Sequence, residues 1–362
     1  MLLWWVYERV DAAILVMPPP SGDKEISYGI RSPFAVQYVH HLAAPPLLAQ
    51  TRTLLGVVGY GAERPDCLPL TCPFVAAPLV PASGDAMFEV WTTAFPTRPC
   101  HDGRVVGAVG GDLAFGVIKL EEAGEASLEE VVEAAYLQIF DFLDKIEVAV
   151  PVRFWNYLKA ITDDDRGLQR YMRFNIGRHR AFSARLRQPI PPTASGVGSH
   201  QGASAIYFLA AREAARPIEN PRQISAYAYP PVYGPASPSF SRASIHARGY
   251  TETLFVSGTA SIVGHETRHA GDLLAQIAET FENLRAVITA AGQTASRPTG
   301  SHWALKAYLR DAAYQKAVDT AISTMFGADS QRLYLRGDIC RSELLVEIEA
   351  FGGFPASEMP SS

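Results

Sequence analysis

The sequence predicts an α+β fold made of two similar units, in which mixed β-sheets are covered by helices on one face. Two segments, 54–182 and 205–351, both run through strand, strand, helix and strand, and the second adds a further helix and strands. No long linker divides them. We therefore expect an N-terminal extension with the first strands (1–53), an N-terminal unit (54–190) and a C-terminal unit (191–362).

In the first segment, the clearest element is a helix over 127–146, whose apolar residues recur at helical spacing. Ser127 followed three residues later by Glu130 forms a capping-box pattern, which marks the start of the helix. Short apolar runs around this helix predict strands at 54–61, 88–93 and 148–158.

The second segment contains a longer series of elements. Apolar residues at helical spacing predict helices over 271–291 and 318–325. Near the end, Leu345, Glu347 and Glu349 alternate with three aliphatic residues, which is typical of a half-buried strand. The strands expected in this segment are 205–212, 253–264, 302–311, 331–337 and 342–351.

Composition excludes several classes of protein. The chain has 362 residues and a net charge of −5, which argues against a surface for nucleic acid or an anionic membrane. The apolar start contains Glu8, Arg9 and Asp11, so it fits neither a signal peptide nor a spanning helix. We expect the first 16 residues to be an upstream extension and the protein to be cytoplasmic. Four cysteines are too few for a disulfide scaffold.

Two short motifs have both a functional and a structural interpretation. HETRH (265–269) matches HExxH, which on a helix places two imidazoles on one face for zinc, with Glu266 as base and Glu282 as a third ligand. Gly264 precedes the motif and places it at a helix entry, so a cap or a solvated turn is favoured over a metal site. GAVGG (107–111) lacks the strand-to-helix context of a phosphate-binding loop and predicts a hairpin turn.

A stretch rich in tyrosine and proline, 219–243, is the best candidate for a ligand site on residue types alone. Arginine binds a carboxylate through two parallel hydrogen bonds, and tyrosine offers a flat face with one donor. These groups suit an anionic, ring-shaped ligand, although a proline-rich surface loop explains the composition equally well. The residues concerned are Tyr227, Tyr229, Tyr233, Phe240, Arg222 and Arg242.

Two further features are weaker. In RYMRFNIGR (170–178), Tyr171 and Arg178 lie seven residues apart, which fits one face of a helix or a strand and loop, and a surface strand and turn is favoured. Glu347 lies in the terminal strand, seven residues after Cys340. A solvent-facing glutamate is the simplest interpretation. A strand that closes a sheet can, however, point alternate side chains into a cleft, where an apolar wall raises a carboxyl pKa.

Several blocks resemble known families. The segment GDLLAQIAETFENLRAVITAAG, then AYLRD and QRLYLRGDICRSELLVEIEAF, resembles the RidA/YjgF (chorismate mutase-like) fold. ENPRQ-x-SAY-x-YP through SFSRA, SGTASIVGHE, FNIGR and LLVEIEA together resemble the chorismatases, over about 54–351. The resemblance implies two RidA-like units, with a pocket for chorismate mainly in the C-terminal one. HETRH falls inside the SGTASIVGHE block, which lowers the zinc interpretation further.

The resemblance also implies roles for six residues. Glu347 and Cys340 correspond to catalytic positions, and Tyr171, Arg178, Tyr229 and Arg242 correspond to substrate-binding positions. Chorismate is a dianion, so two arginines can each hold one carboxylate. Its enol ether is cleaved by protonation of the terminal methylene carbon, which requires an acid that is held close and protonated near neutral pH. Neither a metal nor an organic cofactor is required.

The implied products are pyruvate and 3-hydroxybenzoate, sometimes with 4-hydroxybenzoate, because Cys340 stands where the aromatising members carry a cysteine. Three alternatives remain open. A hydrolytic chorismatase would give a dihydroxycyclohexadiene carboxylate, a RidA-like imine deaminase would use an arginine near Arg332, and a non-catalytic metabolite-binding protein would need the arginines but not Glu347. The small-molecule partner is chorismate, and both a monomer and a homotrimer fit.

Overall fold

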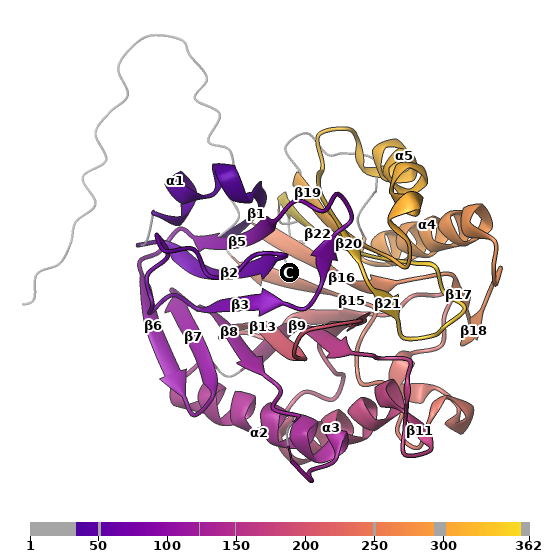
Figure 1. Ribbon diagram of the computed structural model, residues 1–362, viewed down its shortest axis with the longest axis horizontal. Coiled ribbons are helices and arrows are strands. Elements are labelled where there is room, and N and C mark those ends of the chain that lie inside the picture. Colours follow the sequence, from indigo (N-terminus) through magenta and orange to yellow (C-terminus); the bar gives the residue numbers. More distant parts are fainter. Residues whose placement is uncertain are drawn as a thin grey trace, which may run out of the picture.

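Three β-sheets enclose a common core, and helices cover the outer faces of the two larger sheets (Figure 1). The computed structural model describes residues 34–49, 52–122, 124–148, 150–248, 251–292 and 302–355. The predicted α+β class, with mixed sheets covered by helices on one face, is confirmed. The first 16 residues lie outside the described part of the chain. None of the described helices is long and apolar enough to cross a bilayer.

The first large sheet lies under two helices, α2 (Leu128–Lys145) and α3 (Arg170–Arg185). The predicted capping box is present, because Ser127 and Glu130 exchange hydrogen bonds at the start of α2. The GAVGG segment ends in the predicted hairpin turn, at Gly111 with a φ of +65°. The strands, in chain order, are β6 (Thr97–Asp102), β7 (Val105–Gly110), β8 (Leu113–Lys119), β9 (Val150–Lys159), β12 (Thr193–Ser199) and β13 (Ala205–Ala211).

Helix α3 corrects the expectation of a strand and turn for 170–178. Phe174, Arg178 and Phe182 recur every four residues and are buried. Gly177 stands in mid-helix because a Cβ atom there would lie 2.3 Å from the carbonyl oxygen of Glu129, where α2 begins. The glycine therefore permits close helix packing and does not mark a turn.

The second large sheet is covered by α4 (Leu273–Ala290) and α5 (Gln315–Phe326). Its strand order, β14-β15-β16-β22-β19-β20, matches the order β6-β7-β8-β13-β9-β12 of the first sheet, position by position. In both sheets only the last pair is parallel. Its strands are β14 (Arg216–Ile218), β15 (Ala243–Arg248), β16 (Thr251–Thr259), β19 (His302–Leu309), β20 (Gln331–Arg336) and β22 (Val346–Pro355).

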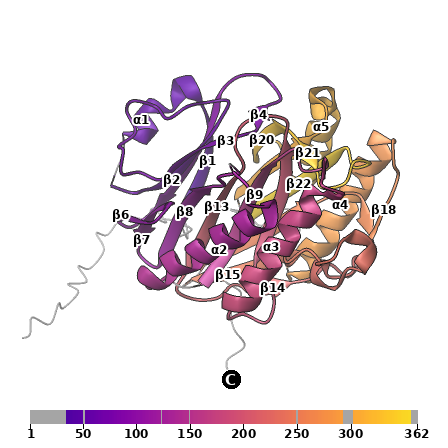
Figure 2. The same ribbon diagram turned by 60° about the horizontal axis from the view of Figure 1, so that its bottom comes forward.

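A third, smaller sheet packs with the two large ones around the common core (Figure 2). The sequence did not predict this sheet. Its order, β1-β5-β2-β3, repeats β8-β13-β9-β12 and β16-β22-β19-β20, with the same single parallel pair at the end. Among the described residues, the short α1 (Pro45–Leu48) and a 3-10 turn are the only helical elements between its first two strands. The strands are β1 (Phe34–His40), β2 (Leu54–Tyr60), β3 (Phe74–Ala77) and β5 (Met87–Thr93).

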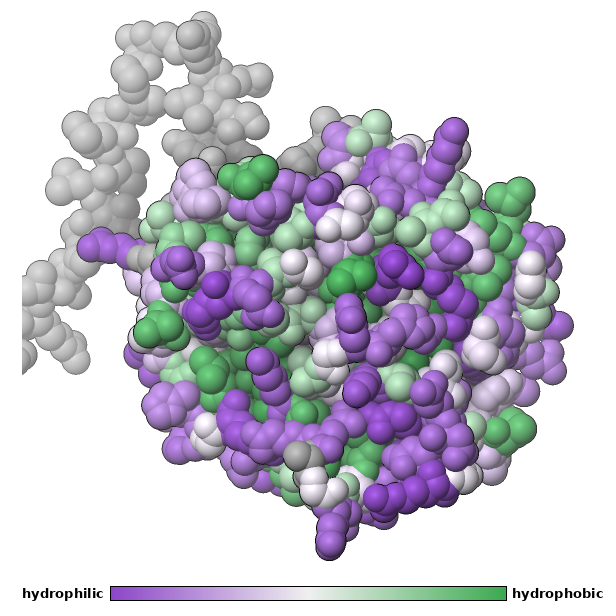
Figure 3. Space-filling view, viewed as in Figure 1, coloured by the Kyte–Doolittle hydropathy of each residue, from purple (hydrophilic) through white to green (hydrophobic). Residues whose placement is uncertain are grey.

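On the face of the molecule seen in Figure 3, hydrophilic and hydrophobic residues are interspersed.

Each large sheet also receives a two-residue strand from a distant part of the chain. β21 (Asp338–Ile339) pairs with β12, and β4 (Val80–Pro81) pairs with β20. β12 and β13 belong to the first sheet, although the expected boundary at 190 placed them in the C-terminal unit. We propose that the boundary lies in 212–215, between β13 and β14.

Buried charges occupy the core where the three sheets meet. Lys306 on β19 lies 3.0 Å from Glu89 on β5 and 2.9 Å from Glu349 on β22, and Arg153 on β9 lies 2.8 Å from Glu349. The side chains of all four are at least 94% buried. Burial acts to raise the pKa of the Glu349 carboxyl, but Lys306 and Arg153 outweigh it and lower this pKa to about 2. The Glu349 carboxyl is therefore ionised near neutral pH.

A ring of tyrosines adjoins this cluster. The hydroxyl of Tyr157 lies 2.9 Å from that of Tyr60 and 3.2 Å from that of Tyr308. Tyr60, Tyr157 and Tyr308 occupy the same register position in the three sheets, opposite Met87, Ala205 and Glu347 respectively. The matching strand orders thus bring equivalent side chains to one point.

Removing one charge of the cluster should destabilise the whole fold. We expect Lys306→Met to lower the free energy of unfolding by about 3–5 kcal/mol, because Glu89 and Glu349 would then lose their shared buried cation. Urea unfolding followed by circular dichroism measures the change. Lys316→Met, at an exposed position on α5, is the matched control and should cost less than about 0.5 kcal/mol. Equal stability of the two variants would contradict the central role of Lys306.

Candidate active site

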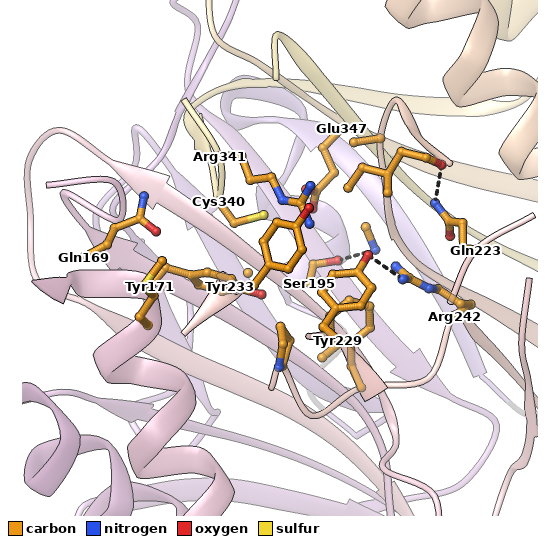
Figure 4. A pocket seen from close by; sticks show the side chains of 18 of the residues that line it. Gln169, Tyr171, Ser195, Gln223, Tyr229, Tyr233, Arg242, Cys340, Arg341 and Glu347 are labelled. Atoms are coloured by element: carbon orange, nitrogen blue, oxygen red, sulfur yellow. Dashed lines mark hydrogen bonds between the residues drawn. The ribbon is translucent and has the colours of Figure 1, made fainter. Parts of the chain in front are cut away.

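A cavity of about 240 Å³ lies between the two large sheets. Its floor is formed by the starts of β12 and β22 and by the end of β16, and α3 forms one wall (Figure 4). The loops 223–240 and 340–343 line the rest. The six residues to which the family resemblance assigns roles all line this one cavity, although they come from five separate segments: Tyr171, Arg178, Tyr229, Arg242, Cys340 and Glu347.

Glu347 is the acidic group at the bottom of the cavity. Its side chain belongs to β22 and is on the inner face of the sheet, so the interpretation as a solvent-facing glutamate is wrong. Gly258 on β16 makes room for it, because a Cβ atom at that position would lie 1.9 Å from Oε1 of Glu347. Among the described residues, none donates a hydrogen bond to this carboxyl.

Burial, followed by the negative charge of Glu349, raises the pKa of the Glu347 carboxyl to about 8. Arg153 and Arg242 act in the opposite direction but do not outweigh burial. Glu347 is therefore mostly protonated at pH 7, which a general acid requires.

Three arginines line the same cavity, and none of them forms an ion pair with a described Asp or Glu. Arg178 donates to Oδ1 of Asn175 at 3.0 Å, and Arg242 donates to the carbonyl of Ile224 and to Oη of Tyr229, both at 2.8 Å. The Nε atoms of Arg178 and Arg242 are buried without a partner. Most other buried or half-buried arginines of the described chain are paired with carboxylates, so these unpaired cations indicate a site for an anionic ligand.

The third arginine, Arg341, is held at the mouth of the cavity. Its Nη1 donates to the carbonyl of His265 at 2.9 Å and to Oγ1 of Thr267 at 3.1 Å. Its guanidinium lies over the ring of Tyr233, 4.1 Å from the centroid. This stacking fixes the side chains of Arg341 and Tyr233 against each other in the lining of the cavity.

Aromatic rings line the cavity between the arginines. Arg242 lies over the rings of Tyr229 and Phe240, at 5.5 and 5.2 Å. Tyr171 projects from α3, and burial, followed by the proximity of Cys340, raises its pKa. Flat apolar faces flanked by cations suit a planar or nearly planar anionic ring.

Cys340 follows β21, so the pairing of β21 with β12 places it in the cavity wall. Burial, followed by the charge of Glu347, raises the pKa of its thiol to about 12. The sulfur is therefore a neutral thiol at pH 7 and not a thiolate nucleophile.

The HETRH motif is not on a helix. It occupies the hairpin of β17 (Ile262–Val263) and β18 (Glu266–Thr267) and the residues after it, and α4 begins only at Leu273. Nδ1 of His265 lies 3.1 Å from Oη of Tyr233, whereas Nε2 of His269 lies 3.3 Å from Glu279. The two imidazoles therefore serve different partners, and no group of three potential metal ligands occurs among the described residues.

Sequence reasoning missed several lining residues. Arg341 was missed although it is adjacent to Cys340. Ser195 and Gly258 carried no local signal, because they reach the cavity only through the contact of β12 with β16.

Tyr233 and Phe240, named in the tyrosine-rich stretch, do line the cavity, whereas Tyr227 and Arg222 do not.

Comparisons with known proteins agree on one family. The model of the N-terminal domain of FkbO/Hyg5-like chorismatases matches residues 89–210. A curated 3-hydroxybenzoate synthase of Streptomyces hygroscopicus is 36% identical, covering 82% of this chain and 91% of its own. A chorismatase of Streptomyces rapamycinicus is 35% identical, covering 82% of this chain and 92% of its own. A crystal structure of a chorismatase matches with a TM-score of 0.77 and 29% identity, covering 88% of this chain and 98% of that chain.

The pKa of Glu347 makes a prediction about stability that needs no substrate. The folded-state pKa of about 8 exceeds the usual 4.5. The contribution of Glu347 to the free energy of unfolding is therefore fully present below pH 4.5 and is lost as the pH rises through 8. Glu347→Gln, which stays neutral, should match the wild type at pH 4 and be more stable at pH 9, on the order of 4 kcal/mol. Thermal unfolding across this range measures the difference.

Glu343→Gln is the matched control for this titration. Glu343 lies in an exposed part of the cavity rim, and its pKa is lowered and not raised. Its replacement should bring no gain of stability at pH 9. A Glu347→Gln variant that gains nothing between pH 4 and 9 would contradict the raised pKa.

Proposed function

The chain belongs to the chorismatase family, and we propose that it removes the enolpyruvyl group of chorismate with Glu347 as the acid. The observation that carries this proposal is the position of Glu347. It is a buried, protonated carboxyl at the bottom of a cavity whose arginines have no acidic partner among the described residues.

The cavity has the groups that a dianionic ring requires. Arg178 and Arg242 approach it from α3 and from the segment before β15, so each can hold one carboxylate of chorismate through parallel hydrogen bonds. Tyr229 and Phe240 would pack against the ring. Arg341 stands at the mouth, where it would meet the substrate first.

The proposed reaction starts with proton transfer from Glu347 to the terminal methylene carbon of the enol ether. This forms a C–H bond and leaves an oxocarbenium ion, which the new Glu347 carboxylate stabilises. Water then adds to the cation, and the C–O bond to the side chain breaks to release pyruvate. With the ring unchanged, the second product is a dihydroxycyclohexadiene carboxylate, and loss of one water from this diol gives 3-hydroxybenzoate.

We propose 3-hydroxybenzoate as the main product, with 4-hydroxybenzoate as a side product. Two observations support it: Cys340 lines the cavity next to Glu347, and the 36% identical relative is a 3-hydroxybenzoate synthase. A neutral thiol of low polarity beside the ring would favour loss of water over its retention. The alternative, release of the diol, needs no group at this position.

The imine deaminase alternative finds less support. Arg332, the arginine it would use, is directed toward α5, where it donates to Asp319, to Ser323 and to the carbonyl of Gly327. It is absent from the cavity lining. A non-catalytic binding protein would have no use for the protonated Glu347.

We also propose a monomer in the cytoplasm. The three sheets of one chain already close the central core, so a homotrimer is not needed to bury it. All four cysteines are free, which fits a reducing compartment.

Incubation of the purified protein with chorismate, with products separated by chromatography and identified by mass, tests the proposed function. We expect pyruvate and 3-hydroxybenzoate. Glu347→Gln should lower kcat at least about 100-fold while leaving chorismate binding within about threefold, because the amide cannot donate a proton to carbon. Absence of pyruvate from the wild type, or full turnover by the variant, would refute the proposal.

The role of Cys340 is tested by the ratio of products. We expect Cys340→Ala to shift the products from 3-hydroxybenzoate toward the diol while pyruvate release continues. Cys72→Ala, at another buried free cysteine outside the cavity, is the matched control and should leave the ratio unchanged. An unaltered ratio in Cys340→Ala would remove this residue from the aromatising step.

A further inference from the structure

We propose that Glu349 is a positioning residue for the acid: its fixed negative charge and its link through Ser195 and Gly258 control the charge and the place of Glu347. The proposal rests on the assignment of Glu347 as the acid. It concerns a residue that does not line the cavity.

The Glu349 carboxylate is immobilised by donors from three strands. It accepts hydrogen bonds at Oε2 from Ser195 at 2.5 Å, from Arg153 at 2.8 Å and from Tyr308 at 3.0 Å. At Oε1 it accepts from Trp155 at 2.6 Å and lies 2.9 Å from Nζ of Lys306. Two cations and three neutral donors hold one carboxylate, so its charge and position are both fixed.

A short chain of contacts connects this carboxylate to Glu347. Oγ of Ser195, which donates to Glu349, accepts a hydrogen bond from the backbone N–H of Gly258 at 3.0 Å. Gly258 is the residue whose missing side chain leaves room for Oε1 of Glu347. A shift of Glu349 would therefore move Ser195, then β16 at Gly258, and then the space that the acid occupies.

Glu347 and Glu349 also interact directly through their charges. They are two residues apart on β22, so their side chains leave the strand on the same face. Other titratable or charged groups face Glu347 from the elements packed around it: Arg153 on β9, Arg242 before β15, Cys340 after β21, Tyr171 on α3 and Tyr308 on β19. Arg178, Arg341 and Glu343 also line the cavity. Of the charges that act on Glu347, Glu349 is the anion, whereas Arg153 and Arg242 favour the ionised form of Glu347.

This arrangement gives Glu349 a part in turnover. Each cycle leaves Glu347 as a carboxylate beside a second carboxylate that cannot take up a proton. The repulsion favours return of a proton to Glu347, which reloads the acid for the next substrate.

The experiment is the pH profile of kcat/KM for chorismate cleavage by the purified protein, because this ratio reports the groups of the free enzyme. The wild type should lose activity as the pH rises through about 8. This loss of activity is the basic limb of the pH profile. Glu349→Gln should move the basic limb to lower pH by about one pH unit or more, because the anion that keeps Glu347 protonated is gone. Glu349→Asp, which retains the charge, should bring the limb back toward its original position.

Glu89→Gln is the matched control. Glu89 is as deeply buried and also binds Lys306, so it tests the effect of merely weakening the core. It does not act on the charge of Glu347 and should leave the basic limb in place. If Glu89→Gln and Glu349→Gln move the limb equally, the role of Glu349 is structural only.

A second variant covers the case in which Glu349→Gln does not fold. Arg153→Gln removes a cation that favours ionised Glu347, so the limb should move to higher pH, opposite to Glu349→Gln. An unmoved limb, or a movement downward, would overturn the proposal.

Failure of the proposed function is recognised separately. If the wild type does not cleave chorismate, the pKa of Glu347 is read from the pH dependence of the stability gained on Glu347→Gln. The midpoint of that dependence should fall when Glu349→Gln is introduced as well. The same midpoint in both backgrounds would refute the inference, whatever the substrate.

Discussion

The contact of Lys306 with Glu89 and Glu349 is the constraint on which the rest of the molecule depends. It joins the third sheet to the second, and Arg153 extends it to the first. Buried charges tolerate little displacement. A buried charge that moves away from its partner loses the attraction that offsets its desolvation, and no water is present to solvate it instead. Together with the tyrosine hydroxyls beside it, the cluster therefore fixes the relative position of the three sheets, and with it the cavity between two of them.

The same strand carries two glutamates with opposite properties. Glu349 faces two cations and three neutral donors, and its pKa falls to about 2, whereas Glu347 is buried beside a fixed anion, and its pKa rises to about 8. Sequence neighbours in a strand differ in this way when the next layer supplies the partners to only one of them. A carboxyl that stays protonated near neutral pH thus arises from the environment and not from the residue type.

Much of the fold could be predicted from the sequence, since helical spacing and a terminal alternating strand are local signals. The six candidate site residues came from the family resemblance, and all six line one cavity. The third sheet could not be predicted, because its strands belong together only through pairings between β1, β2, β3 and β5. Helix α3 was not favoured because the seven-residue spacing of Tyr171 and Arg178 fits a helix and a strand with a loop alike, and the close packing of Gly177 on α2 leaves no local signal. The roles of Ser195, Gly258 and Glu349 depend on contacts between distant strands, which no spacing in the chain records.

The three sheets place Glu347, Ala205 and Met87 at equivalent register positions, each opposite a tyrosine of the central ring. In an assembly of identical subunits, every junction must carry the same residue. Linking the units in one chain releases them from that identity. One junction is then free to carry a buried acid, while alanine and methionine occupy the same position at the other two. The difference between the junctions is in this sense a product of covalent linkage.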